Sequence, residues 1–269
     1  MRTILVSKND WKPAGKRQHA EDQSDVIDEP CVLRDATTNE LLAAQLRLPT
    51  DNEGTAKAVE MSIKFETDVP MDSARPARLS GIGSRNRVFG TVEPNKLRRR
   101  PACSPSRLDI EQAELVKALG ALAAAGCNEW QQTDAATHDK HTDIVRSQIH
   151  TDWLIGQTPF TSGVINFTAG LPYHKDSGNL IDSWSLMLSL RSNVEGGNLH
   201  LPEYGVTLGI FDRSVTIFNG QAIWHGVTPF HISKRNAHRF TIVYYAKQKV
   251  TQCGCRTDEL RRVQQAASR

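Results

Sequence analysis

The sequence predicts an α+β protein whose core is a double-stranded β-helix, or jelly roll, backed by helices. Residues 160–247 contain many short β-type runs, among them "TSGVINFT", "WSLMLSL" and "RFTIVYYAK", separated by Gly, Asn, Pro and Asp. Closely spaced short strands with turn signals are typical of sandwiches and barrels. Two helical patterns precede these runs. We therefore expect the jelly-roll core at about 160–247, with the helices packed against it.

The first 74 residues are expected to form an N-terminal extension, and residues 75–269 the main domain. Residues 8–30 are polar and lack periodicity, which indicates a mobile or loosely packed segment. The run "CVLRDATTNELLAAQLRL" (31–48) predicts a hairpin, because two apolar stretches flank an Asp/Thr/Asn turn.

Two helices are expected between residues 106 and 156. The first, "SRLDIEQAELVKALGALAAAG", carries an apolar stripe and ends at Gly126, the expected C-cap. The second, "HTDIVRSQIHTDWLIG", has apolar residues at every fourth position. The stripe residues are Leu108, Leu115, Leu119 and Leu122 in the first helix, and Val145, Ile149 and Trp153 in the second.

Composition narrows the setting of the protein. The longest apolar run, "LGALAAAG" (119–126), is far shorter than the ~20 residues that cross a membrane. The start, "MRTILVSKND", turns polar too early for a secretory signal, so an intracellular protein is expected. Five cysteines in 269 residues do not indicate a disulfide framework, which favours a reducing compartment. Zinc binding by Cys103, Cys127, Cys253 and Cys255 is the less favoured alternative, since their spacing is not a standard one.

One stretch is strongly basic, with Glu93 as its only acid. It contains Arg75, Arg78, Arg85, Arg87, Lys96, Arg98, Arg99 and Arg100. Such clustering indicates contact with a polyanion, and a solvated basic loop is the alternative. The "RRR" at 98–100 would also suit a nuclear localisation tract in a eukaryote.

Three His-x-Asp triplets occur, at 141–143, 150–152 and 174–176. The 150–152 triplet falls within the second predicted helix, where residues two apart point about 200° away from each other and cannot share an ion. The 141–143 triplet lies at the start of that helix, where we expect an N-terminal turn. We expect Thr142 or Asp143 to cap the start of that helix. The third lies in "LPYHKDSGN", an extended turn after a strand, where residues i and i+2 share a face.

A second histidine is needed to complete a two-His-one-carboxylate iron site. His225 in "NGQAIWHGVTP" is the candidate, and a buried core histidine is the alternative. In "RFTIVYYAK", period two places Arg239, Thr241, Val243, Tyr245 and Lys247 on one face and apolar residues on the other. This pattern predicts the wall of a wet, anion-binding pocket, whereas an ordinary half-exposed strand is the alternative. A buried Arg239 would need a carboxylate partner.

Together with "GGNLHLPEYG", these motifs resemble the TET/JBP family of Fe(II)/2-oxoglutarate-dependent DNA base dioxygenases, in its compact phage, fungal and protist form. The resemblance covers about 160–247, with a weaker echo in "SGIGSRNRVFG" (80–90). It implies that His174, Asp176 and His225 hold Fe(II), and that Arg239 and Thr241 bind 2-oxoglutarate. It also implies that Asn179 reads a flipped base, that Tyr245 packs against it, and that Lys247 stands where animal members place a base-contacting histidine.

The implied reaction uses Fe(II), 2-oxoglutarate and O2 to oxidise the 5-methyl group of a DNA base, by base flipping and ferryl hydrogen abstraction. 5-Methylcytosine in double-stranded DNA, converted to 5-hydroxymethylcytosine and further, is the expected substrate. The DNA backbone is expected to contact Arg85, Arg87, Lys96, Arg98, Arg99 and Arg100. A monomer is favoured, located in the nucleus of a eukaryote or in the cytoplasm for a phage or bacterial source.

Several alternatives stay open from the sequence. The same chemistry could act on thymine, on a protein side chain or on alkylated nucleic acid, and Lys247 in particular leaves thymine open. A prolyl hydroxylase of this fold usually carries Lys where Arg239 stands, and the Arg-x-Asn-x-Thr-x-Arg pattern of AlkB-like demethylases is absent near "KRNAHRFT". A jelly roll that binds nucleic acid without catalysis is the remaining alternative.

Overall fold

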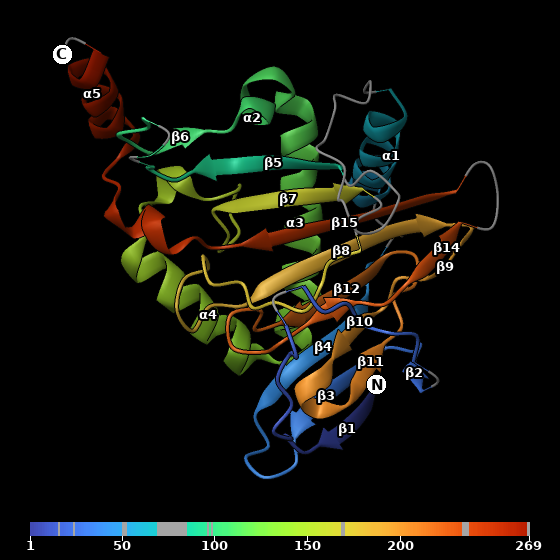
Figure 1. Cartoon of the computed structure of the whole chain (residues 1–269). Helices are drawn as coiled ribbons and strands as arrows, with labels where there is room; N and C mark the ends of the chain where they lie inside the picture. The colour runs from blue at the N-terminus through green and yellow to red at the C-terminus, as the bar shows by residue number, and fades with distance from the viewer. Residues whose placement is uncertain are drawn as a thin grey trace.

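The computed structural model describes residues 1–15, 17–23, 25–49, 53–68, 85–95, 97, 99–167, 170–232 and 237–267. Its largest sheet has nine strands among these residues, and Figure 1 shows them from one edge of the sheet to the other. In spatial order they are β1 (Arg2–Val6), β3 (Cys31–Asp35), β4 (Leu41–Arg47), β12 (Ser214–Phe218), β8 (Ser185–Ser192), β15 (His238–Tyr245), β7 (Ser162–Phe167), β5 (Arg85–Val92) and β6 (Ser104–Pro105).

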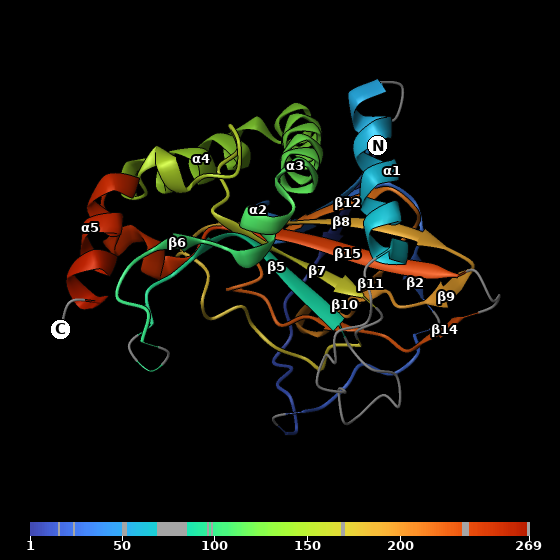
Figure 2. The same ribbon diagram turned by 90° about the horizontal axis from the view of Figure 1, so that it is seen from above.

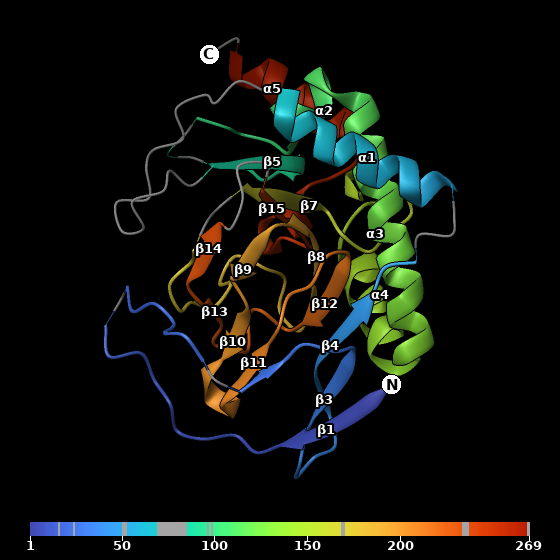
Figure 3. The same cartoon turned by 90° about the vertical axis from the view of Figure 1, so that its right-hand side faces the viewer.

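Two smaller sheets lie across from the centre of the large one, as Figure 3 shows, which gives the two facing layers of a jelly roll. The first contains, in order, β13 (Gly226–Val227), β10 (Leu199–Leu201), β11 (Val206–Leu208) and β2 (Val26–Ile27). The second pairs β14 (Phe230–Ile232) with β9 (Val194–Gly196). The predicted fold class is confirmed.

Helices cover the other face of the large sheet, as Figure 2 shows from above. They are α1 (Glu53–Asp68), α2 (Arg107–Glu111), α3 (Ala113–Thr133) and α4 (Ala135–Gln148), while α5 (Arg256–Ala267) lies beyond the last strand. The apolar stripe of α3, with Leu119 and Leu122 fully buried, packs in one cluster with Leu186, Ile242 and Tyr244 of the sheet. Supporting helices were predicted on this physical ground, because an amphipathic helix must bury its apolar face.

The predicted helix ends are wrong in two places. Helix α3 does not end at Gly126 but continues to Thr133. Gly126 is a packing glycine: a Cβ there would lie 2.8 Å from Leu186 Cδ1, so its absence lets α3 approach β8 closely. Helix α4 begins at Ala135, and the Asp134 carboxylate caps it by accepting a hydrogen bond from the Thr137 N–H. Thr142 and Asp143 therefore lie within the helix and are not its cap.

The hairpin predicted over 31–48 is confirmed as β3 and β4. Strand β4 also pairs with β12, so this hairpin extends the core sheet. Part of the segment 8–30 is docked as well, because the Trp11 ring lies 4.6 Å from that of Tyr173 and 6.3 Å from that of Trp224. The predicted boundary at residues 74 and 75 falls outside the described residues.

Two of the cysteines are joined. Cys103 and Cys253 form a disulfide, which the number of cysteines did not predict. Cys127 is buried in α3, in a different apolar cluster from Cys103 and Cys253, so the four cysteines considered for zinc are not gathered. Within the described ranges, no helix is both long and apolar enough to cross a bilayer.

Candidate active site

The structure brings His174, Asp176 and His225 together. His174 and Asp176 lie in the turn between β7 and β8, and His225 directly precedes β13. Their metal-binding atoms all lie within 4.8 Å of one another. The Asp176 carboxylate is 3.5 Å from His174 Nε2 and 3.9 Å from His225 Nε2. Two imidazoles and one carboxylate converging in this way form the donor set of a non-haem Fe(II) site.

The orientation of both imidazoles suits a metal. His174 Nδ1 lies 2.8 Å from the Pro172 carbonyl oxygen, and His225 Nδ1 lies 3.0 Å from that of Ile223. Because a carbonyl only accepts, each Nδ1 carries a proton, so Nε2, on the side of Asp176, is the atom left to bind a metal, and it gives up any proton shared with the carboxylate when a metal binds. Burial, with the positive charge of His174, lowers the pKa of His225 to about 4, which keeps this imidazole neutral.

The two half-buried members of the triad, His174 and Asp176, behave as a pair. Burial opposes the charged form of His174, but its hydrogen bonds to Asp176 and to the Pro172 carbonyl outweigh burial and raise its pKa. Burial likewise works against the Asp176 carboxylate, yet the two histidines and Asn179 hold its pKa below the ordinary value. Asp176 is therefore an ionised carboxylate at neutral pH, as a metal ligand must be. Gly220 lies so close to Asp176 that a Cβ would collide with its Oδ2.

A cavity of about 420 Å³ opens beside this triad. Residues of β5, β7, β8 and β15 line it, together with the turns after β7 and β12. The predicted alternation of β15 is confirmed: Arg239, Thr241, Val243 and Tyr245 line the cavity, while Phe240, Ile242 and Tyr244 lie in the core under α3.

Arg239 is buried at the cavity, with an exposed fraction of only 2%. Its Nη2 donates to the Gly197 carbonyl at 3.1 Å, and its guanidinium lies 5.1 Å from the centre of the Phe230 ring. Burial and the neighbouring charge of Arg191 lower the pKa of Arg239 to about 10, so it stays charged at neutral pH. Thr241, 5% exposed, follows on the same face. A buried cation beside a hydroxyl is suited to an anionic carboxylate.

Asn179 lies between the triad and the wall of the cavity. Its Nδ2 donates to Asp176 Oδ2 at 3.4 Å and to Ser185 Oγ at 3.1 Å. Its backbone forms a β-bridge with Lys247, which places Lys247 at the same side of the cavity. Burial raises the pKa of the Tyr245 phenol well above its usual value, so Tyr245 is neutral.

Glu93 is a cavity-lining residue that the sequence analysis did not assign to the site. It follows the last residue of β5 and pairs with Lys247, with 3.4 Å between Oε2 and Nζ. Its position as the single acid of a basic stretch was the available signal. The cavity thus has a carboxylate and an ammonium side by side in its wall.

Only some of the basic residues predicted to contact DNA are among the described residues. Lys96 and Arg98 lie outside the described residues, and so does the side chain of Arg85. Arg87 is half-buried on β5 and Arg99 is exposed. Arg100 pairs with Asn95 through two backbone hydrogen bonds, of 2.8 and 2.9 Å, which close a turn after β5. Their contact with DNA stays a prediction.

The other two His-x-Asp triplets are structural, as predicted. His141 is fully buried, its Nδ1 accepting from the Trp184 N–H and its Nε2 donating to the Pro159 carbonyl, both at 3.1 Å. The 150–152 triplet is not inside α4 as expected. His150 caps a short 3-10 helix, Thr151–Trp153, and Asp152 accepts a hydrogen bond from the Arg256 N–H.

Comparison with known proteins agrees with this geometry. Residues 97–248 match the family Tet_JBP, described as the oxygenase domain of the 2OGFeDO superfamily. Thymine dioxygenase JBP1 of Trypanosoma brucei brucei is 25% identical over 212 residues, which cover 75% of this chain and 24% of that protein. The same protein of strain 927/4 GUTat10.1 gives the same values. The chain thus spans about a quarter of the length of these curated relatives.

The solved structure of NgTET1 in complex with 5mC DNA has a similar fold, with a TM-score of 0.65 and 11% sequence identity. The match covers 98% of this chain and 90% of that chain. At this identity the likeness is one of fold. The matched family over more than half of the chain shows that this protein belongs to the TET/JBP family of oxygenases, whose chemistry uses Fe(II), 2-oxoglutarate and O2.

Proposed function

We propose that this protein oxidises the 5-methyl group of a DNA base, with the conversion of 5-methylcytosine to 5-hydroxymethylcytosine as its main reaction. The observation that carries the proposal is the arrangement of the cavity. The His174, Asp176 and His225 donor atoms, the buried Arg239 and the amide of Asn179 all line one space of about 420 Å³. Such a space brings a metal, an anionic cosubstrate and a polar ligand within reach of one another.

In this proposal the triad holds the iron. Backbone carbonyls fix the Nδ1–H groups of His174 and His225, so that the two Nε2 atoms and the Asp176 carboxylate lie together. When bound with 2-oxoglutarate and O2, Fe(II) supplies the oxidising power that breaks a C–H bond of the methyl group. The protein contributes the orientation of the ligands and the exclusion of water from a cavity with a mostly apolar lining.

Arg239 and Thr241 hold the distal carboxylate of 2-oxoglutarate. A guanidinium that is 2% exposed is costly to bury, and a carboxylate that forms a charge-assisted hydrogen bond with it offsets this cost. The neighbouring Arg191 adds positive charge, and its own guanidinium donates to the carbonyl oxygens of Ile210, Val194 and Gly196. The distal carboxylate therefore enters a region of positive potential.

Asn179 supports 5-methylcytosine over thymine. The Asp176 carboxylate only accepts hydrogen bonds, so the Asn179 atom facing it is the amide nitrogen. Among the described residues the Asn179 Oδ1 has no hydrogen-bond donor assigned to it, which leaves an acceptor for a ligand. In a 5-methylpyrimidine the group next to the methyl is the C4 substituent. This is an amine donor in 5-methylcytosine and a carbonyl acceptor in thymine, so the Oδ1 acceptor favours the amine.

Glu93 and Lys247 form the second polar wall for the base. A carboxylate accepts and an ammonium donates, so the pair complements a base edge on which a donor and an acceptor are adjacent. The Watson–Crick edge of cytosine has this arrangement at N4 and N3. It becomes accessible only when the base leaves the duplex, at a cost of a few kcal/mol.

Thymine oxidation is the second candidate. It is favoured by the similarity to the thymine dioxygenase JBP1, and by Lys247, whose ammonium can donate to the thymine O4. DNA as the partner is supported by the likeness to NgTET1, solved in complex with 5mC DNA, and by thymine, the base named for JBP1, being a base of DNA. The basic residues after β5 supply the positive charge that phosphates require.

The test is nucleoside mass spectrometry. A duplex with 5-methylcytosine at defined positions is incubated with the protein, Fe(II), 2-oxoglutarate and ascorbate, and then digested. We expect 5-hydroxymethylcytosine to exceed 5-hydroxymethyluracil. The reverse order would assign the enzyme to thymine, and two unchanged bases beside continued succinate production would exclude DNA bases as the substrate.

A further inference from the structure

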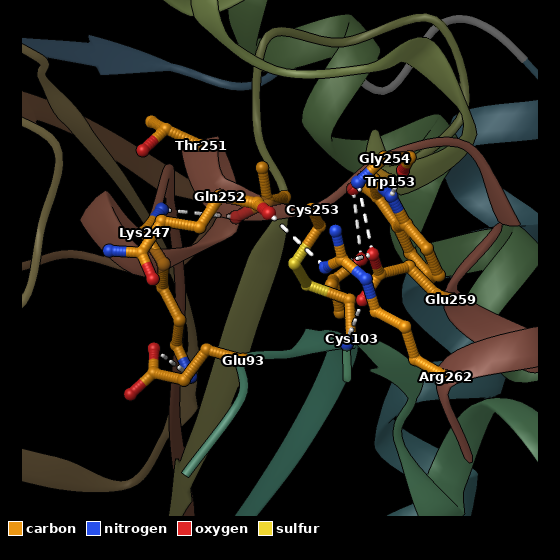
Figure 4. The surroundings of a disulfide bond; sticks show 12 residues. Glu93, Cys103, Trp153, Lys247, Thr251, Gln252, Cys253, Gly254, Glu259 and Arg262 are labelled. Carbon is orange, nitrogen blue, oxygen red and sulfur yellow. Dashed lines mark hydrogen bonds and ion pairs between the residues drawn. A yellow bond between two sulfur atoms is a disulfide. The ribbon is translucent and has the colours of Figure 1, made fainter. Parts of the chain in front are cut away.

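We propose that the Cys103–Cys253 disulfide positions one wall of the substrate cavity, and that its reduction weakens DNA binding while leaving the reaction with 2-oxoglutarate intact. The inference rests on the proposed function for the identity of the substrate. The disulfide itself joins two chain segments that each carry a cavity-lining residue, Glu93 on one and Lys247 on the other. Figure 4 shows both residues beside the disulfide.

The first segment is the hairpin loop 93–103, between β5 and β6. Its two ends are held by the β5–β6 ladder, in which Thr91 pairs with Pro105 and Val92 with Ser104. Glu93 begins the loop at the cavity. The basic residues Arg99 and Arg100 follow in its turn. Cys103, 3% exposed, ends the loop at the disulfide.

The second segment runs from Lys247 to Cys253, through the short 3-10 helix Gln248–Gln252. It is fixed to the site at both of its first residues. The Lys247 N–H donates to Thr161 Oγ1 at 3.1 Å, and the Gln248 N–H donates to the Gly178 carbonyl at 3.1 Å. Gly178 precedes Asn179, so this hydrogen bond ties the second segment to the turn that carries the Asn179 amide, the group proposed to bind the base.

Two links between the loop and the second segment are found among the described residues. At the cavity, the Glu93–Lys247 ion pair spans 3.4 Å between side chains that are 23% and 18% exposed. Partly exposed ion pairs of this kind contribute little by themselves. At the far end, the disulfide is a covalent link across a sequence separation of 150 residues. The disulfide is therefore the stronger of the two links that hold the loop against the Lys247 segment.

A buried carboxylate holds the two backbone segments that flank the disulfide. Glu259 of α5, whose side chain is 1% exposed, accepts hydrogen bonds from the Cys103 N–H at 2.8 Å and the Gly254 N–H at 3.0 Å. It also pairs with Arg262 at 2.7 Å. These contacts keep Cys103 near Cys253 when the sulfur–sulfur bond is broken. Reduction is therefore expected to loosen the loop locally, with the rest of the fold retained.

The redox step balances with a dithiol, or with two molecules of a monothiol such as glutathione, as the reductant. The S–S bond accepts two electrons and two protons, which yields the Cys103 and Cys253 thiols, while the reductant becomes a disulfide. Loosening of the loop then weakens the pre-ordering of Glu93 and of its basic turn, and DNA binding must supply that ordering free energy. We expect the DNA dissociation constant and the KM for DNA to rise about tenfold on reduction.

The experiment compares wild type with the double variant Cys103→Ser/Cys253→Ser, each kept in an oxidising or a reducing glutathione buffer. Intact-mass spectrometry counts the disulfide, and fluorescence anisotropy measures binding of a labelled duplex. Succinate formation without DNA reports the folded iron and 2-oxoglutarate site. Cys255→Ser is the matched control, because Cys255 is a half-buried free thiol two residues from Cys253.

Three results would support the inference together. Oxidised wild type and oxidised Cys255→Ser bind DNA tightly, reduction weakens both, and the double variant binds weakly in both buffers. Succinate formation without DNA is the same in every sample. Equal DNA binding in all samples would overturn the inference, as would a wild type that forms no disulfide in the oxidising buffer, or a double variant that loses succinate formation as well. Redox-dependent binding without any base oxidation would overturn the proposed function alone.

Discussion

His174 and His225 donate hydrogen bonds to each other's backbone carbonyl, at 2.9 and 3.1 Å. This single β-bridge joins two residues that are far apart in the sequence. It places the centres of their imidazole rings 4.3 Å apart. A further backbone hydrogen bond between the same two turns positions the third ligand: the Asp176 N–H donates to the Gly220 carbonyl at 2.9 Å. Backbone pairing between the two turns therefore builds the metal site, and Gly220 and Gly226, which flank the second turn, permit the close approach.

Gly226→Ala tests this reliance on backbone approach. A Cβ at Gly226 would lie 2.7 Å from Tyr173 Cδ1, and Tyr173 is held in place by a 2.6 Å hydrogen bond to His200 Nδ1. The strain falls on the bridge beside His225, and overpacking of this kind costs about 1–3 kcal/mol. We expect about a tenfold loss of Fe(II) affinity, measured by titration calorimetry under argon. Gly170→Ala, where the nearest atom is 3.9 Å away, should bind Fe(II) as wild type does. Equal affinities for all three proteins would contradict the prediction.

Arg239→Gln should impair the use of 2-oxoglutarate selectively. The substitution removes a buried cation from the proposed carboxylate site, and loss of one partner of a buried charged pair costs about 2–5 kcal/mol. We expect the KM for 2-oxoglutarate to rise about a hundredfold or more, with the DNA dissociation constant unchanged. Arg213→Gln is the control, since that side chain is 45% exposed. An unchanged KM for 2-oxoglutarate would remove Arg239 from the site.

Asn179→Ala should change the preference between bases. Loss of the Oδ1 acceptor removes the contact to the C4 amine of 5-methylcytosine, so kcat/KM for this base should fall by a larger factor than kcat/KM for thymine, by about tenfold. The ratio is the informative quantity, because Asn179 also touches Asp176 and its loss lowers both rates. Ser185→Ala removes the other hydrogen bond of the Asn179 nitrogen and keeps Oδ1, so the wild-type ratio should persist. An identical ratio in the Asn179 variant would assign base selection elsewhere.

His141 predicts an acid-sensitive fold. Burial lowers its pKa in the folded state to about 3, from an ordinary value of 6.5, so the unfolded chain binds the proton first. The unfolding free energy should therefore decrease as pH falls from about 6.5 toward 3, by up to about 1.4 kcal/mol per pH unit. Urea unfolding across this range measures the slope. His141→Gln should flatten it, and His150→Gln, at an exposed side chain, should not. A wild-type slope in His141→Gln would contradict the assignment.

The strand of the cavity wall could be predicted from sequence because its information is local. Alternation along Arg239, Phe240 and Thr241 follows from strand geometry alone, and the structure has the same alternation. The choice of the 174–176 triplet also depended on local context, an extended turn against a helical setting. The fold class followed from the number of short strands.

The missed features depend on contacts between distant segments. Gly126 resembles a helix C-cap by sequence, and only the approach of Leu186 explains a glycine inside α3. Glu93 meets Lys247, and Cys103 meets Cys253, across about 150 residues, a relationship that no local pattern encodes. The hairpin 31–48 was visible, but its pairing with β12 required the whole sheet.

A crystal structure grown without oxygen from protein, Fe(II) and 2-oxoglutarate tests the central claim most directly. The account predicts one ion bound by His174 Nε2, His225 Nε2 and an Asp176 oxygen, with the distal carboxylate of 2-oxoglutarate on Arg239. An ion bound at another place, or a cosubstrate that leaves Arg239 without a carboxylate, would contradict it.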